Sequence, residues 1–371
     1  MRTEYITPVL SGLANLQNYA QQWYLDKGLT WPAQPPVNKI DLHHHFVPDF
    51  YAQGRKLTSA ICELGDPSGW PTPKWSPSSS RMIMKHLGVL SAILSVTAPG
   101  PCVVSDPNEQ AALARKLNEH AAALRDEDHH AFGFFASLPD VTNSTAALAE
   151  INYALDTLGA DGVTLFTRYG PNATYLGNPS IEPVWRELDR RGATVFVHPT
   201  HPADTATPNA YMPQPLVDYP HETTRAAVDM ITSRTLRKFP NVKVVLSHAG
   251  GTLPFMAGRL LTPLRKTPGV VASWMAGTTH DEAAQALKTF YYDVALSTSP
   301  QVLRTLLEVV PHDHIVYGSD FPYAPASAYP AFLEDLESFD VTPELRDMVN
   351  FGNAQSLISR LGKQVQISEL K

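Results

Sequence analysis

Residues 39–46 read KIDLHHHF, a short apolar run that ends in three consecutive histidines. Apolar runs of strand length recur along the chain, at residues 39–42, 92–96, 131–135, 162–166, 194–197, 243–246, 289–294 and 314–317. Most are continuously apolar, which is typical of parallel strands covered on both faces. Segments of helical pattern separate most of them, at 108–127, 144–158, 179–191, 222–239 and 300–310. Eight strands alternating with helices predict an α/β fold, the (β/α)₈ barrel.

The predicted barrel takes up residues 39–371 and is preceded by an N-terminal extension, residues 1–38. In this extension, residues 10–25 have an amphipathic helical pattern, and the stretch WPAQPPVNK indicates an extended linker. Residues 66–80, DPSGWPTPKWSPSSS, predict a long loop inserted after the first strand. Long loops of this kind usually serve a site, so we expect this one to cover it.

Composition and charge exclude several classes of protein. Of the 371 residues, 43% are hydrophobic and 18% charged, which is typical of a globular domain. The net charge of -7 and the absence of a basic run argue against nucleic acid as a partner. Two cysteines exclude a disulfide framework. With no apolar stretch of membrane-spanning length and no signal peptide pattern, we expect a cytoplasmic enzyme that does not bind membranes.

Four predicted strands end in residue types that commonly bind metals. The segments are DLHHHF, VFVHPTHP, VVLSHAGG and IVYGSDFP. Catalytic residues of a barrel lie at these strand ends. Alternate strand residues point to one side, so His43 and His45 can face one ion while His44 points away. Together with His198 and Asp320 they suit Zn²⁺, Mn²⁺ or Fe²⁺ and leave a position open. Each has a simpler explanation, such as a helix N-cap for Asp320, but four such ends in one barrel favour a metal site.

Several segments resemble the decarboxylase branch of the amidohydrolase superfamily, typified by 2-amino-3-carboxymuconate-6-semialdehyde decarboxylase. They are IDLHHHF, PHETTRAA at residues 220–227, LSHAGGTLPFMAGRL and YGSDFP. The resemblance runs from about residue 39 to about residue 352. It implies a homodimer with one divalent metal ion, Zn²⁺ or Mn²⁺, in each subunit. The residues that it assigns are the metal ligands His43, His45, His198 and Asp320, the catalytic His248, and Arg259, which binds the substrate carboxylate in the neighbouring subunit.

The chain departs from other members of the superfamily at two places. After the fourth strand, GVTLFTRYG offers no counterpart of the bridging lysine of binuclear enzymes, so we expect one metal ion. Where the semialdehyde decarboxylase has an arginine pair, this chain has only Arg81. The N-terminal extension, the segment from Trp75 to Pro77 and the neutral Gly251 are more similar to fungal 6-methylsalicylate decarboxylases.

These features favour non-oxidative decarboxylation of an ortho-hydroxy aromatic acid, with 6-methylsalicylate converted to m-cresol and CO₂. The metal would hold the phenol oxygen, and His248 or Asp320 would protonate the ring carbon. No glycine-rich phosphate loop is present, so we expect no organic cofactor. The aromatic residues expected to form the pocket walls, with ordinary packing as the alternative, are Phe46, Trp75, Phe321 and Tyr323. Two other hypotheses stay open here, a metal-dependent hydrolase of a lactone or amide, and a catalytically silent metal-binding barrel.

Overall fold

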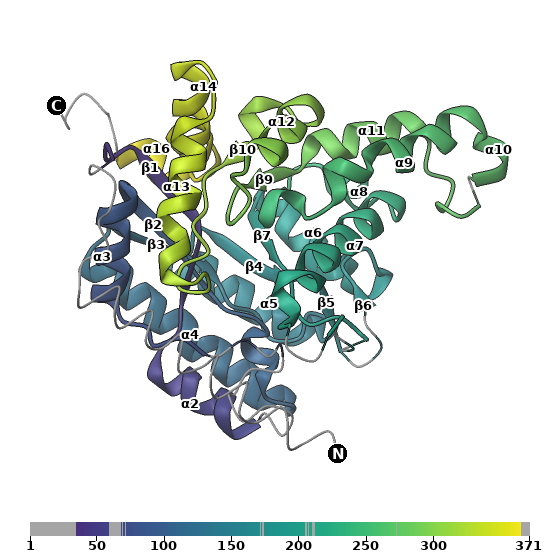
Figure 1. Ribbon diagram of the computed structural model, residues 1–371. Coiled ribbons are helices and arrows are strands. Elements are labelled where there is room, and N and C mark those ends of the chain that lie inside the picture. The colour runs from purple at the N-terminus through teal and green to yellow at the C-terminus, as the bar shows by residue number, and fades with distance from the viewer. Residues whose placement is uncertain are drawn as a thin grey trace.

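The computed structural model describes residues 35–58, 68, 70, 72–170, 172, 174–204, 206, 208–209, 212–271 and 273–364 (Figure 1). The N-terminal extension predicted for residues 1–38, including its helix, lies outside the described residues except for 35–38. Within the described part of the chain, no helix is long and apolar enough to cross a membrane.

One eight-stranded parallel sheet forms the centre of the described structure, in the order β1-β2-β3-β4-β7-β8-β9-β10. Its strands are β1 (Lys39–Phe46), β2 (Val89–Val96), β3 (Phe132–Ala136), β4 (Gly162–Phe166), β7 (Thr194–His198), β8 (Lys243–Leu246), β9 (Tyr291–Asp293) and β10 (Ile315–Val316). The chain that follows β10 returns to β1, where Leu42 N donates to Tyr317 O at 3.1 Å and His45 N to Phe321 O at 2.7 Å. These bonds close the sheet, and the predicted (β/α)₈ barrel is confirmed.

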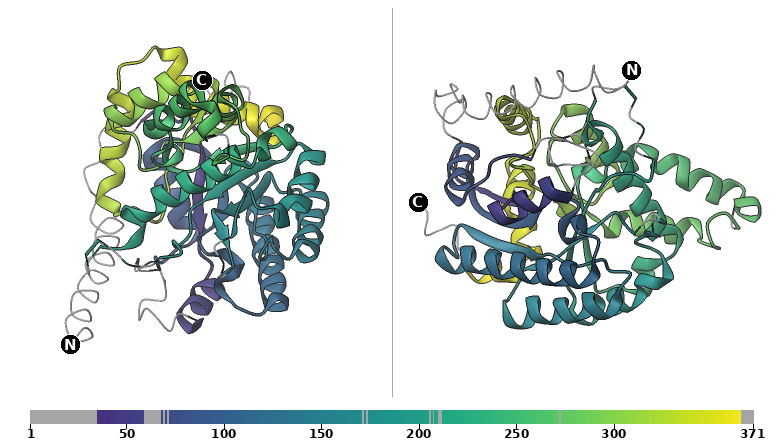
Figure 2. Two further views of the ribbon diagram at one scale, coloured as in Figure 1. Left: turned by 90° about the vertical axis from the view of Figure 1, so that its right-hand side faces the viewer. Right: turned by 90° about the horizontal axis from the view of Figure 1, so that it is seen from below.

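Helices surround the barrel, as two further views show (Figure 2). They are α2 (Asp49–Thr58), α3 (Pro77–Leu87), α4 (Pro107–Glu127), α5 (Ser144–Asn152), α6 (Glu182–Arg191), α7 (Asp218–Thr232), α8 (Thr235–Lys238), α9 (Leu253–Lys266), α10 (Pro268–Val271), α11 (His280–Thr289), α12 (Pro300–Val309), α13 (Tyr329–Ser338), α14 (Pro343–Asp347), α15 (Asn353–Leu357) and α16 (Ser359–Gln364). The short strands β5 (Arg168–Tyr169) and β6 (Thr174–Tyr175) pair outside the main sheet. The ends of α9 and α11 and the short α10 project away from the barrel (Figure 1).

Two sequence predictions about these elements need correction. The loop predicted for residues 66–80 ends at residue 76, because Ser76 caps α3 through a capping box with Ser79 and Pro77 occupies the first turn. The helix predicted for residues 222–239 begins earlier, at Asp218, and breaks into α7 and α8. Arg234 interrupts it with a left-handed backbone, φ 61°.

Two apolar clusters fill the described structure and determine which end of the barrel is open. The larger cluster lies between the strands and the surrounding helices. The smaller cluster packs residues of the strands, such as Ile40 and Phe135, against Phe351 and Leu357 from the C-terminal segment. This segment closes the end of the barrel at which the strands begin, so a site can form only at the carboxyl ends of the strands.

Candidate metal centre

The histidine triplet on β1 is divided between the two sides of the strand. His43 and His45 point inward, and their Nε2 atoms lie 3.1 Å apart. His44 points the other way, where its Nδ1 atom donates to Asp41 Oδ2 at 3.0 Å and its Nε2 atom accepts from Ser80 Oγ at 2.9 Å. All three imidazoles are buried. The period of two along a strand therefore separates the middle histidine from the site, as the sequence predicts.

Asp320 reaches the two inward histidines through a tight turn after β10. Gly318 passes so close to β1 that a Cβ atom on it would lie 2.6 Å from the Cβ of His43. Asp320 itself has a left-handed backbone, φ 59°, and its N–H donates to His43 O at 2.7 Å. Its Oδ1 atom lies 3.2 Å from His43 Nε2 and 3.1 Å from His45 Nε2. A strained backbone held in this way is typical of functional sites.

His198, at the end of β7, completes the cluster. Its ring centroid lies 5.1 Å from that of His43 and 4.7 Å from that of His45. One ligand atom from each of His43, His45, His198 and Asp320 lies within 4.8 Å of the others, and all four side chains are buried. The structure thus brings together the four residues that the sequence suggests as metal ligands, from three strand ends.

The hydrogen bonds of the Nδ1 atoms in the three histidines determine whether their Nε2 atoms can bind a metal ion. Each Nδ1 atom faces an oxygen that can accept its proton, which leaves Nε2 of the neutral imidazole with a free lone pair. For His45 this includes Ser95 Oγ at 3.1 Å, whose own proton can go to His44 O at 3.5 Å. The pairs are His43 with Asp293 Oδ2 at 2.9 Å, His45 with Ser95 O at 3.3 Å and His198 with Pro199 O at 2.7 Å. Buried lone pairs converge beside Asp320 Oδ1, which has no hydrogen-bond partner among the residues that the structure describes, and this arrangement fits a divalent cation.

The pKa values in the cluster suit the same conclusion. Burial alone would raise the pKa of Asp320, but His43 and His45 hold that pKa well below its usual range, so the carboxylate is ionised. Burial lowers the pKa of His45 and, with help from its histidine neighbours, that of His198, so both are neutral ligands. Burial would also lower the pKa of His43, but Asp293 and Asp320 raise it to about 10. Two buried carboxylates thus attract positive charge to this position.

His248 lies beside the cluster and has a different environment. It follows β8 in a run of residues with positive φ, beginning at 55° for His248 itself. Its backbone N–H donates to Asp293 Oδ1 at 2.9 Å, and its Nδ1 atom donates to Ala295 O at 3.0 Å. The Nε2 atom is then free to face the cavity, 3.9 Å from Asp320 Oδ2. That separation is too long for a hydrogen bond, so the two groups can both face a reacting atom.

The PHETTRAA segment supports the backbone after His248. It lies on α7, where Thr224 Oγ1 accepts from the N–H of Thr252 at 2.8 Å and contacts Thr252 Oγ1 at 2.9 Å. A Cβ atom on Gly251 would lie 2.0 Å from Pro220 O, so only glycine fits between α7 and the turn. The two motifs therefore act as one packed unit that fixes the position of His248.

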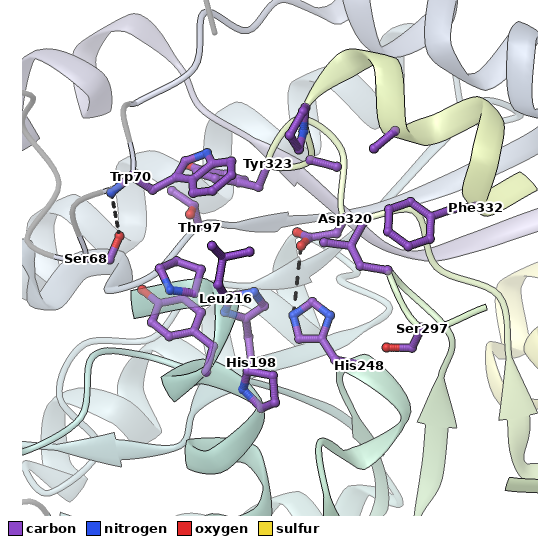
Figure 3. A pocket seen from close by; sticks show the side chains of 17 residues that line it. Ser68, Trp70, Thr97, His198, Leu216, His248, Ser297, Asp320, Tyr323 and Phe332 are labelled. Carbon is purple, nitrogen blue, oxygen red and sulfur yellow. Dashed lines mark hydrogen bonds and ion pairs between the residues drawn. The ribbon is translucent and has the colours of Figure 1, made fainter. Parts of the chain in front are cut away.

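A cavity of about 280 Å³ opens beside His198, His248 and Asp320 (Figure 3). Most of its wall is apolar, and in this view Trp70 and Phe332 lie on opposite sides of Asp320. The lining residues are Ser68, Trp70, Thr97, His198, Pro215, Leu216, Tyr219, Pro220, His248, Leu296, Ser297, Asp320, Tyr323, Ala324, Pro325, Ala328 and Phe332. None of these described residues is a lysine or arginine. The size and lining suit a small aromatic molecule.

Of the four aromatic residues expected in the pocket wall, the structure places only Tyr323 there, with its ring edge-on to His45 at 5.4 Å. Phe46 points to the outer side of β1, because it alternates with His45, and packs edge-on against Trp75 at 6.2 Å. Trp75 is held on the same side by its Nε1–H bond to Ser80 Oγ at 2.9 Å. The Phe321 ring packs at a tilt of 37° against His44, with the ring centroids 5.1 Å apart, again outside the barrel. These three are packing residues, and their placement corrects the sequence prediction.

The two arginines considered from the sequence lie outside the cavity. Arg81 pairs with Asp128 at 3.3 Å on the outer side of the barrel. Arg259 lies exposed on α9 and does not line the cavity of its own chain. After β4, Arg168 donates to the carbonyl oxygens of His201 and Pro202 at 2.6 and 2.8 Å. No lysine is among the described residues that line the cavity beside the cluster.

Sequence reasoning missed several residues of the site. Trp70 and Ser68 belong to the loop that we expected over the site, but from that segment only Trp75 was proposed. Leu296 and Ser297 follow β9, a strand end that we did not consider. Asp293 also ends β9, and a carboxylate at the end of an apolar strand was the signal that could have identified it.

Comparison with known proteins places these features in a family. The model of the amidohydrolase family matches residues 40–359. The 6-methylsalicylic acid decarboxylase of Penicillium expansum is 46% identical over 323 residues, which cover 87% of this chain and 97% of that protein. A solved structure described as amidohydrolase II is 30% identical, with a TM-score of 0.77, and covers 86% of this chain and 99% of its own. The dihydroxybenzoic acid decarboxylase of Polaromonas sp. JS666, solved with manganese and an inhibitor, has the same fold, with a TM-score of 0.72, 19% identity and coverage of 87% and 97%.

Proposed function

The chain belongs to the amidohydrolase family, and from this premise we propose that it is a metal-dependent decarboxylase that converts 6-methylsalicylate to m-cresol and CO₂. The observation that carries the proposal is the convergence of His43, His45, His198 and Asp320 at the wall of an apolar cavity of aromatic size. The 6-methylsalicylic acid decarboxylase relative supports the choice of substrate.

We propose one divalent ion at this centre, with Mn²⁺ preferred over Zn²⁺. Three imidazoles and a carboxylate suit both ions, and the structure of the Polaromonas relative contains manganese. When bound, the ion supplies a Lewis acid that withdraws charge from the phenol oxygen of the substrate. The expectations of no organic cofactor and of a cytoplasmic location stay predictions.

The remaining chemistry falls to the side chains of the cavity. Loss of CO₂ leaves an electron pair on the ring carbon, so that carbon must gain a proton. We assign proton delivery to His248 Nε2, which faces the cavity and is not one of the four ligands. The Nδ1–H bond to Ala295 O holds the ring in position and leaves Nε2 directed at the cavity. Asp320 Oδ2 lies on the other side of the gap, 3.9 Å from His248 Nε2.

The apolar side of the cavity supports a methyl substituent on the ring. Leu296, Ala328 and Phe332 line the cavity, and none of them carries a hydrogen-bonding group in its side chain, whereas the neighbouring Ser297 does. A methyl group gains from contact with such a surface, whereas a hydroxyl group there would lose its hydrogen bonds to water. The wall therefore favours 6-methylsalicylate over a dihydroxybenzoate.

We propose a homodimer in which Arg259 of a second copy binds the substrate carboxylate. Among the described residues that line the cavity there is no lysine or arginine to bind that carboxylate. Arg259 lies exposed on the projecting α9, beside Phe255, which is 85% exposed, and Met256. An apolar patch next to an arginine that forms no ion pair within the described part of the chain is typical of a protein interface. An arginine lent by the partner would complete the site through charge-assisted hydrogen bonds.

Incubation of the full-length, manganese-loaded protein with 6-methylsalicylate tests the proposed function. We expect CO₂ and m-cresol in equal amounts, and loss of both after treatment with a chelator. A parallel incubation with aromatic lactones and amides serves as the control for hydrolysis. Cleavage of a lactone or amide, with no CO₂ released from any hydroxybenzoate, would overturn the decarboxylase assignment.

A further inference from the structure

Asp293 contacts both halves of the site without facing the cavity. It ends β9, is fully buried, and does not line the cavity. Its Oδ2 atom accepts from His43 Nδ1 at 2.9 Å. Its Oδ1 atom accepts from two backbone groups, His248 N and Ala295 N, both at 2.9 Å. One carboxylate therefore holds a metal ligand with one oxygen and the proton-delivering segment with the other.

We propose that Asp293 is a positioning residue that sets the tautomer of His43 and, at the same time, the backbone position of His248. The inference rests on the proposed metal centre, but it is independent of which substrate the enzyme uses. Asp293 also lies within 4.8 Å of His43 and His248 in a possible ligand group. We assign it no metal ion, because both of its oxygens are already hydrogen-bonded, to His43 Nδ1 and to two backbone N–H groups.

The contact with His43 has a chemical consequence that the other ligand histidines do not share. His45 and His198 donate their Nδ1–H groups to backbone carbonyl oxygens, which are neutral. Only His43, of these three, donates to a carboxylate. An ionised partner increases the basicity of the imidazole and fixes Nε2 as the free nitrogen. His43 should therefore be the most strongly binding of the three histidines, and Asp293 the reason for it.

The contact with His248 stabilises an unfavourable backbone conformation. His248 and Ala249 have φ values of 55° and 56°, which residues other than glycine rarely adopt. Asp293 Oδ1 accepts the N–H at the start of this segment, and the neighbouring Ala295 carbonyl accepts the imidazole Nδ1–H. The end of β9 thus holds both the backbone and the side chain of His248.

An amide at position 293 cannot reproduce these contacts. In Asp293→Asn the single oxygen can accept either from the two backbone N–H groups or from His43 Nδ1, but not from both sides. We expect the oxygen to stay with the two backbone donors. The NH₂ group then faces His43 Nδ1 and favours the tautomer with the proton on Nε2, where the metal must bind.

The test measures two properties of the full-length protein, its affinity for Mn²⁺ and the protection of its backbone amides from hydrogen exchange. Neither measurement requires catalytic activity. We expect Asp293→Asn to weaken Mn²⁺ binding about 10- to 100-fold in a competition with a chelator. Ser95→Ala removes the hydroxyl but keeps the backbone carbonyl that accepts from His45 Nδ1, so it should weaken Mn²⁺ binding only about threefold. Asp161→Asn is the control for a buried carboxylate, since Asp161 pairs with Arg360 away from the cluster. It should leave Mn²⁺ affinity unchanged.

Hydrogen exchange of the segment 247–252 is the second readout. If the amide turns its oxygen towards His43, metal affinity is kept and exchange in this segment becomes about tenfold faster instead. Wild-type metal affinity together with wild-type protection in Asp293→Asn would overturn the inference, and so would equal loss of affinity in Asp161→Asn. If Asp293→Asn does not fold, Asp293→Ser is measured in its place, and its shorter side chain should lose both Mn²⁺ affinity and protection of residues 247–252. Failure of the decarboxylase assay would leave this result unaffected, so the two proposals fail separately.

Discussion

The hydroxyl of Ser319 donates a hydrogen bond of 2.6 Å to Asp41 Oδ2, and the Ser319 N–H donates to Asp41 Oδ1 at 3.0 Å. Ser319 directly precedes Asp320, so Asp41 fixes the turn that carries the site aspartate. We expect Asp41→Asn to weaken Mn²⁺ binding about tenfold, because an amide cannot accept at both positions. Chelator competition measures this, with Asp161→Asn as the buried control. Unchanged affinity would show that the turn holds Asp320 without Asp41.

The middle histidine of the triplet should matter for stability and the third for metal binding. His44→Ala removes buried hydrogen bonds to Asp41 and Ser80 and should lower the free energy of unfolding by about 1–3 kcal/mol. Metal content of the folded variant should stay near one ion per chain. His45→Ala should weaken metal binding by more than about 100-fold with a smaller loss of stability. Urea unfolding and elemental analysis distinguish the two, and loss of metal in folded His44→Ala would contradict this division.

The metal content of their alanine variants distinguishes the role of His248 from that of Asp320. His248→Ala should keep the metal ion and lose about 10²- to 10⁴-fold in kcat, as expected for a missing proton donor. Asp320→Ala should lose metal and activity together. Turnover in D₂O, followed by mass spectrometry of the cresol, shows whether one deuterium enters at the former carboxyl carbon. Near-normal kcat in His248→Ala would make that residue structural.

The sequence predicts the parts of the site that depend on strand periodicity. The spacing of His43 and His45 predicts that both lie on one side of the strand, and the barrel places His198 and Asp320 beside them. That this side faces inward depends on the register irregularity between Asp41 and His44, because Ile40 and Leu42 also face the interior. The same period of two would have excluded Phe46 from the pocket, because it alternates with His45. Strand alternation alone therefore places Phe46 on the side opposite to His45.

Other features depend on contacts between strands that lie far apart in the sequence. Asp293 and His43 are separated by 250 positions, and their contact follows from the lateral arrangement of strands in the barrel. The choice between Trp70 and Trp75 depends on where α3 begins, which the capping box at Ser76 decides. Nothing in the local composition of the loop distinguishes the two tryptophans.

The apolar wall of the cavity should discriminate between two substrates of nearly the same shape. A methyl group and a hydroxyl group differ little in size, so contact with Leu296, Ala328 and Phe332 decides between them. We expect kcat/KM for 6-methylsalicylate to exceed that for 2,6-dihydroxybenzoate by about 10- to 100-fold. Leu296→Asn should narrow this ratio by offering the hydroxyl a partner. A ratio near one in the wild type would show that the wall does not contact this substituent.

The proposed role of Arg259 can be tested by mixing two inactive variants. If Arg259 acts in the site of a second copy, a His248→Ala subunit still lends its arginine, and an Arg259→Ala subunit still has an intact His248. A heterodimer of the two then contains one complete site, whereas each variant alone contains none. After the subunits are exchanged at equal concentrations, about a quarter of wild-type activity should return. Arg259→Lys is the matched control for charge, and it should recover less than the arginine because it cannot bind a carboxylate at two points. If a dimeric, metal-loaded mixture recovers no decarboxylase activity, Arg259 does not act in the partner's site. If Arg259→Ala has an unchanged KM, Arg259 does not bind the substrate.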